Sequence, residues 1–105
     1  MKVWIVGVGD CEGNSIRCVC ATKGIAEREL FKARDELVAE WETIDIEHQK
    51  DIKKYCEKEG VSYTDNMYKD MIVALSGNDY EKWDNYPHDR PYIYEIEIMD
   101  NQGEL

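Results

Sequence analysis

Cysteine, histidine and acidic side chains are the groups of this chain that could bind a metal ion or attack a substrate. The four cysteines occupy positions 11, 18, 20 and 56, and the two histidines occupy positions 48 and 88. Structural zinc is usually held by closely spaced C-x2-C pairs, and this sequence contains none. The sequence therefore predicts no metal and no cofactor. It indicates that Cys18, Cys20 and Cys56 pack as small apolar side chains.

The segment from Gly7 to Gly13 gathers Asp10, Cys11 and Glu12 behind an apolar run. Its glycines resemble part of a dinucleotide fingerprint, but that motif must open a helix, and here a second strand-like segment follows. A Cys–His pair could supply a nucleophile and its base, yet no flanking signature of such a pair is present. We therefore predict that the chain is not an enzyme. A small-ligand binder or enzyme that uses this loop and the thiols is the alternative.

Acidic residues dominate the charge of the chain, which carries 23 acids and 13 bases for a net charge of −10. The excess is concentrated in two segments. Residues 35–51 hold seven acids and one base, and residues 79–105 hold eight acids and two bases. Direct binding of nucleic acid requires lysines and arginines that neutralise phosphates, so this balance argues against it. It favours a protein partner with a basic surface.

Two groups of residues are the candidates for contact with such a partner. The first is a set of acids that could imitate a row of phosphates: Glu36, Glu40, Glu42, Asp45 and Glu47. The alternative for this set is a solvated helix face. The second is an aromatic and acidic loop that offers interface residues: Tyr80, Trp83, Asp84 and Tyr86. The alternative for the loop is that Trp83 and Tyr86 close one end of the core.

These residues must be positioned by a small set of helices and strands. Alternating apolar residues predict strands over 2–8, 15–22 and 92–99, the first two joined as a hairpin. In the second strand, Ile16, Cys18 and Cys20 share the side that we expect to face the core. A helix is predicted from Gly24 to Trp41, starting at the cap Thr22. Its apolar stripe recurs every three or four positions: Ala26, Leu30, Ala33, Leu37 and Trp41.

Further helices are predicted over 46–59 and 65–76, which gives the order β-β-α-α-α-β. We expect an α+β fold in which the first helix packs on a three-stranded antiparallel sheet, with the terminal strand beside the first. The other two helices would form an inserted hairpin. Residues 1–100 are expected to make a single domain, and residues 101–105 a flexible tail. No apolar run is long enough to cross a membrane, and the first residues do not form a signal peptide, so a cytoplasmic location is expected.

The chain resembles small uncharacterised phage and prophage accessory proteins at two places. Residues 19–27 read V-C-A-T-K-G-I-A-E, close to the V-F-x-T-K-E-x-A-E entry into the helix of those proteins, with Gly24 in place of the usual Glu. Residues 91–100 resemble their acidic closing strand. The resemblance implies a hairpin, a helix and a closing strand, and a phage-encoded protein in the host cell cytoplasm. It implies no mechanism, because the group has no common activity.

We therefore expect a small acidic, phage-type protein that binds another protein and inhibits a host defence or nucleic-acid-processing enzyme. The small-ligand binder or enzyme described above is one alternative. A self-associating structural module, in which the free edges of the sheet pair between copies as a homo-oligomer, is another.

Overall fold

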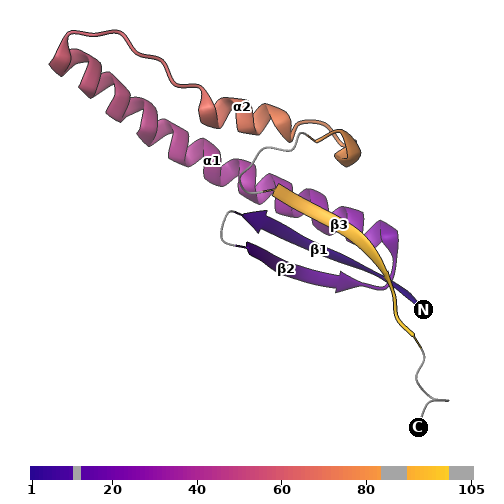
Figure 1. Cartoon of the computed structure of the whole chain (residues 1–105). Coiled ribbons are helices and arrows are strands. Elements are labelled where there is room, and N and C mark those ends of the chain that lie inside the picture. Colours follow the sequence, from indigo (N-terminus) through magenta and orange to yellow (C-terminus); the bar gives the residue numbers. More distant parts are fainter. Residues whose placement is uncertain (11–12, 84–89, 100–105) are drawn as a thin grey trace. The chain divides into compact units, whose positions relative to one another are not determined.

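A computed structural model describes residues 1–10, 13–83 and 90–99 (Figure 1). The chain divides into two compact units. The sheet unit contains residues 1–35 and 87–105, and the helical unit contains residues 36–86. Each unit is described separately below. Neither α-helix in the described part of the chain is both long and apolar enough to span a membrane.

The sheet unit contains three antiparallel strands. Strand β1 (Lys2–Asp10) lies in the centre, between β2 (Gly13–Cys20) and β3 (Arg90–Glu97). Both neighbours run antiparallel to β1. The predicted α+β class and three-stranded antiparallel sheet are confirmed, and so is the expected place of the terminal strand beside the first (Figure 1).

The first part of helix α1 (Lys23–Glu59) belongs to the sheet unit and covers one side of the sheet (Figure 1). Val6 and Cys20 are buried on that side, and Ala26 and Leu30 of α1 are buried as well. Burial of side chains as large as Val6 and Leu30 stabilises the fold by roughly 1.5–3 kcal/mol each. The five residues of the predicted apolar stripe are all buried in the structure: Ala26, Leu30, Ala33, Leu37 and Trp41.

A β-bulge changes the second strand from the predicted pattern. Val6 pairs with Cys18, but Gly7 pairs with Ile16, so Arg17 is an extra residue in β2. An inserted residue moves every earlier side chain of a strand to the other face. Ile16 is consequently 60% exposed rather than packed beside Cys18. The extra residue, Arg17, forms an ion pair of 3.4 Å with Glu29 of α1.

Helix α1 runs without interruption for 37 residues, so the prediction of separate helices over 24–41 and 46–59 was wrong. The predicted gap, Glu-Thr-Ile-Asp at positions 42–45, contains neither glycine nor proline, and no residue there must leave helical geometry. Thr43 instead bonds back to the Ala39 carbonyl at 3.1 Å. The predicted cap is present, because the Ile25 amide donates to Thr22 Oγ1 at 3.3 Å.

The helical unit pairs the rest of α1 with a short return segment. Helix α2 (Met67–Ala74) lies within the predicted 65–76, and a 3-10 turn, η1 (Tyr80–Lys82), follows it. The chain therefore has two α-helices in its described part, not the three that were predicted. Five large apolar residues of this unit are buried: Leu37, Trp41, Met71, Leu75 and Trp83.

Candidate protein-binding groove

The continuous helix sorts the predicted acidic residues into two groups. Residues three, four or seven apart share one face of a helix, whereas residues two apart do not. Glu36, Glu40 and Glu47 therefore form one exposed row, which we call the acidic row. Glu42 and Asp45 lie on a different side of α1. From Glu36 to Glu47 the row covers twelve residues, roughly 16 Å along the axis.

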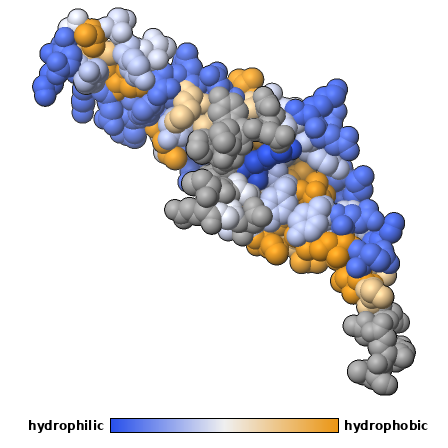
Figure 2. Space-filling model, in the orientation of Figure 1, coloured by the Kyte–Doolittle hydropathy of each residue, from blue (hydrophilic) through white to orange (hydrophobic). Residues whose placement is uncertain are grey.

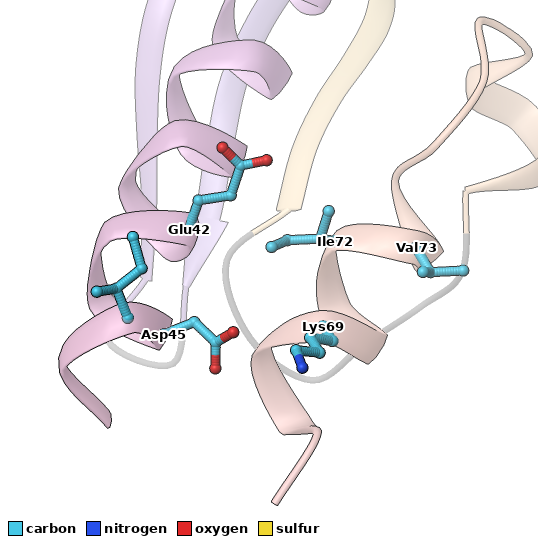
Figure 3. A pocket seen from close by; sticks show the side chains of 6 residues that line it. Glu42, Asp45, Lys69, Ile72 and Val73 are labelled. Atoms are coloured by element: carbon cyan, nitrogen blue, oxygen red, sulfur yellow. The ribbon is translucent and has the colours of Figure 1, made fainter. Parts of the chain in front are cut away.

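Glu42 and Asp45 border a groove that opens between α1 and α2 of the helical unit (Figure 3). The groove has a volume of about 510 Å³. Ile46 completes its α1 side, and α2 contributes the three remaining lining residues: Lys69, Ile72 and Val73. Figure 3 shows both carboxylates reaching from α1 toward the α2 side of the groove.

Apolar side chains of the groove are open to solvent. Val73 is 68% exposed and Ile46 is 58% exposed, although both are aliphatic. Asp45 also accepts a hydrogen bond of 3.1 Å from Gln49, which holds its carboxylate in place. The groove thus combines an apolar lining with two carboxylates and one lysine. That combination suits an amphipathic segment that carries positive charge.

A hydrogen-bonded clamp joins α1 to the start of α2. The His48 ring donates to Asp65 Oδ2 at 2.8 Å, and Gln49 donates to the Asp65 carbonyl at 2.8 Å. Asp65 Oδ1 accepts from the amide of Met67, the first residue of α2, at 2.9 Å. The Tyr68 ring meets the His48 ring edge to face, with centroids 5.7 Å apart. The clamp fixes the return segment against α1.

Hydrogen bonds lower the pKa of the clamp carboxylate. The bond from His48 is the larger cause of the lowered Asp65 pKa, and the bond from the Met67 amide adds to it. The folded chain therefore favours the ionised carboxylate. Its stabilising contribution is complete above the ordinary Asp pKa, near 3.9, and is lost as the pH falls through the lower folded value.

We expect acid to weaken the clamp in a way that depends on Asp65. Urea midpoints of the wild-type chain and of Asp65→Asn should differ most at pH 5 and converge toward pH 3, because only the wild type loses a charge at this position. Comparison of the two chains removes the contribution of the other carboxylates. A difference that stays constant over this range would show that the carboxylate charge does not stabilise the clamp.

A second, smaller groove lies beside the clamp. Its volume is about 390 Å³. It is lined by His48, Asp51, Ile52, Tyr55 and Tyr63. Cys56 lies nearby, with its Sγ 3.9 Å from the Tyr63 carbonyl. Asp51 offers a carboxylate, and Tyr55 and Tyr63 offer exposed phenol rings, to a basic side chain of a partner.

The aromatic loop is only partly within the described residues. Trp83 is 4% exposed, and its indole N–H donates to the Gly77 carbonyl at 3.1 Å. Tyr80 meets the Trp83 ring edge to face, with centroids 6.3 Å apart. Asp84 and Tyr86 lie outside the described residues. Of the two interpretations of Trp83, burial in the core is therefore the one that the structure favours.

The thiols of β2 lie beside each other under α1. Cys18 Sγ is 3.6 Å from Cys20 Sγ, and burial, followed by the contact with Cys20, raises the pKa of the Cys18 thiol. A raised pKa disfavours the reactive thiolate. Within the described ranges, no three His, Cys, Asp or Glu side chains are grouped to hold a metal ion. Cys11, Glu12 and His88 lie outside those ranges.

Comparison with known proteins gives no match for this chain among family models, curated proteins or solved structures. The groove is therefore interpreted from its own residues. Sequence reasoning singled out Glu42 and Asp45 as site residues but missed Ile46, Lys69, Ile72 and Val73. A helical projection of residues 65–76 places Val73 away from the stripe of Tyr68, Met71, Ile72 and Leu75. An aliphatic residue off the buried stripe was the signal that could have found it.

Proposed function

We propose that this chain binds a protein partner through a basic amphipathic segment that docks in the groove between α1 and α2. The observation that carries the proposal is the exposed aliphatic lining next to two carboxylates. Apolar groups of the partner would cover Ile46 and Val73, and its lysines or arginines would meet Glu42 and Asp45. Basic partners are favoured because residues 36–86 contain thirteen acids and six bases.

The acidic row supports this proposal from another face of α1. Its three carboxylates lie on one exposed helix face within the same unit as the groove. Exposed charges of one sign contribute mainly to the rate of association and to the choice of partner, and their effect is screened by salt. The row would therefore attract a basic partner, while the groove supplies the contacts that hold it.

The proposal is tested with synthetic helical peptides of about 18 residues, a length that forms roughly five helical turns. One peptide has leucines along one face and lysines on the other. A second replaces lysine with glutamate, and a third replaces leucine with serine. Fluorescence anisotropy should show binding of the lysine–leucine peptide alone at low micromolar concentration. Equal binding of the lysine–serine peptide would mean that charge alone acts and that the groove has no role.

Neutralising the groove acids should weaken this binding. The double variant Glu42→Gln, Asp45→Asn should lower the affinity about tenfold and reduce its dependence on salt, because two close charge pairs are lost. The matched control is Glu57→Gln, Glu59→Gln, which makes the same change in net charge at the far end of α1. A control that weakens binding as much as the groove variant would exclude the groove as the contact.

The apolar lining and the acidic row are tested separately. Val73→Ser should lower the affinity for the lysine–leucine peptide severalfold without altering the salt dependence of binding, because it removes an apolar contact and no charge. Replacing Glu36, Glu40 and Glu47 with glutamine should mainly slow association, as expected for charges that steer encounter. Stopped-flow measurements at two salt concentrations distinguish these effects.

Inhibition of a nucleic-acid-processing or host-defence enzyme is the biological role that we propose for this binding. A surface that normally holds nucleic acid is rich in lysine and arginine, and it would be complementary to the acidic helical unit. Such an inhibitor must compete with nucleic acid for its partner. Once a partner is known, displacement of labelled DNA or RNA by the wild-type chain, but not by the Glu42→Gln, Asp45→Asn variant, tests this role.

A further inference from the structure

The sheet of the sheet unit has a second, apolar face. Side chains of a strand alternate between faces, so the face opposite Val6 and Cys20 carries the odd-numbered residues of β1 and the even-numbered residues of β3. In the described residues it consists of Met1, Val3, Ile5, Ile16, Val19, Arg90, Tyr92, Tyr94, Ile96 and Ile98. We call it the open face. Val3 and Ile5, on the central strand, are already buried, so the exposed part of this face lies on β2, β3 and the chain's first residue. Figure 2 shows apolar residues gathered on this side of the sheet, and α1 lies behind the sheet in Figure 1.

Strand β3 has alternating apolar and polar residues, the pattern of a strand that buries one of its two sides. Its apolar side, from Tyr92 to Ile98, belongs to the open face, yet Tyr94 is 46% exposed and Ile98 is 47% exposed. On β2, Val19 is 59% exposed on the same face. The Tyr92 and Tyr94 rings stack 5.8 Å apart and give this face a flat aromatic surface. Aromatic surfaces of this kind are favoured at protein interfaces.

The open face lacks the charge that dominates the rest of the chain. Apart from Arg90 at the start of β3, none of its described side chains is ionisable near neutral pH, and none is acidic. Lys2 forms its ion pair with Glu95 on the opposite side of the sheet. A basic partner would gain nothing here. A second copy of the chain, which carries a net charge of −10, is repelled least when it approaches through a face without acidic residues.

Pairing through the edge of β3 is less favourable than packing through its face. Met1 and Ile98 exchange both backbone hydrogen bonds, at 2.7 and 3.2 Å. Because this orientation alternates along an antiparallel strand, Pro91 directs its peptide nitrogen away from β1, toward the outer edge. Proline has no N–H there to offer a new strand. The edge is thereby weakened as a pairing site, and the face is not.

We infer that the open face is the interface of a symmetric homodimer, in which two sheets pack face to face. Three strands of eight residues cover roughly 26 by 14 Å. Two copies would therefore bury on the order of 1,000 Å² of accessible surface, near the lower limit of specific interfaces. A dimer of this size should be reversible and form at micromolar concentration.

Sedimentation velocity of the full chain over a concentration series tests the dimer. The wild type should change from monomer to dimer between about 1 and 500 µM, and the dimer should strengthen in 1 M NaCl, because salt screens the repulsion between acidic copies. This salt dependence is opposite in sign to that expected for the basic peptide. A chain that stays monomeric at 500 µM in 1 M NaCl would refute the inference and leave the face to a different partner.

Two variants locate the interface. Val19→Lys, Tyr94→Lys places two charges on the open face and should weaken the dimer at least 30-fold. Val73→Lys is the control, because it adds a charge at an exposed aliphatic position of the helical unit. It should leave the dimer intact. Circular dichroism verifies that both chains fold. Loss of the dimer in Val73→Lys, or its persistence in the double variant, would overturn the inference.

Discussion

Replacing Gly7 with alanine should destabilise the chain by about 3 kcal/mol, the upper range for overpacking a tight site. A Cβ at this position would collide with the Ser15 carbonyl oxygen of β2 and with the Tyr92 ring of β3. The carbonyl belongs to the backbone beside the bulge and cannot withdraw without disturbing the pairing of β1 and β2. Thermal unfolding followed by circular dichroism should show a melting temperature lower by more than 10 °C.

A matched control for Gly7 lies at the start of α1. Gly24 has open space where a Cβ would be added, and alanine favours a helix more than glycine does. Gly24→Ala should therefore raise stability by roughly 0.5–1 kcal/mol. Adding Tyr92→Leu to Gly7→Ala tests which neighbour causes the effect. If the double variant regains full stability, the ring is the obstacle and the Ser15 carbonyl is not.

Replacing Thr43 with proline should cost about 3 kcal/mol or more, because position 43 lies inside the continuous helix α1. Proline removes the amide that would bond to the Ala39 carbonyl, and its ring collides with that carbonyl. A proline kink at position 43 also changes the angle between the two parts of α1 on either side of it. We expect a lower urea midpoint together with weaker binding of the lysine–leucine peptide, since Glu42 and Asp45 lie on either side of the substitution.

Thr43→Ala is the control for this prediction. It removes the hydroxyl that bonds to Ala39 but keeps the backbone amide and improves helix propensity. Its stability should equal or slightly exceed that of the wild type. A chain in which two helices met at residues 42–45 would tolerate proline there. Unchanged stability of Thr43→Pro would therefore contradict the single helix.

The two proposed surfaces differ in the force that each would use. The helical unit offers carboxylates with an apolar lining and should bind more weakly as salt increases. The open face of the sheet unit is apolar and carries no carboxylate, and it should associate more strongly under the same conditions. A salt series on the wild type, read once by peptide anisotropy and once by sedimentation, therefore reports on both surfaces independently.

The helix spacing in the sequence determined most of the buried side of α1. Its stripe from Ala26 to Trp41 was predicted residue by residue, because a period of 3.6 requires these side chains to share one face. Alternation likewise predicted the three strands, and the turn-rich segment before β2 predicted the hairpin. These features depend on local geometry and on the partition of apolar side chains, both of which a single sequence records.

Tertiary structure alone decided where the sequence signals were weak or ambiguous. The fusion of two predicted helices at 42–45 and the bulge at Arg17 depend on backbone hydrogen bonds that no composition rule reveals. The position of Asp65 against His48 joins residues seventeen apart, and sequence spacing cannot place them together. The acids of residues 35–51 were visible at once. Only the continuous helix divided them into an exposed row and a groove border. In an unbroken helix each residue adds the same rotation about the axis, so the spacing of two acids decides whether they share a face.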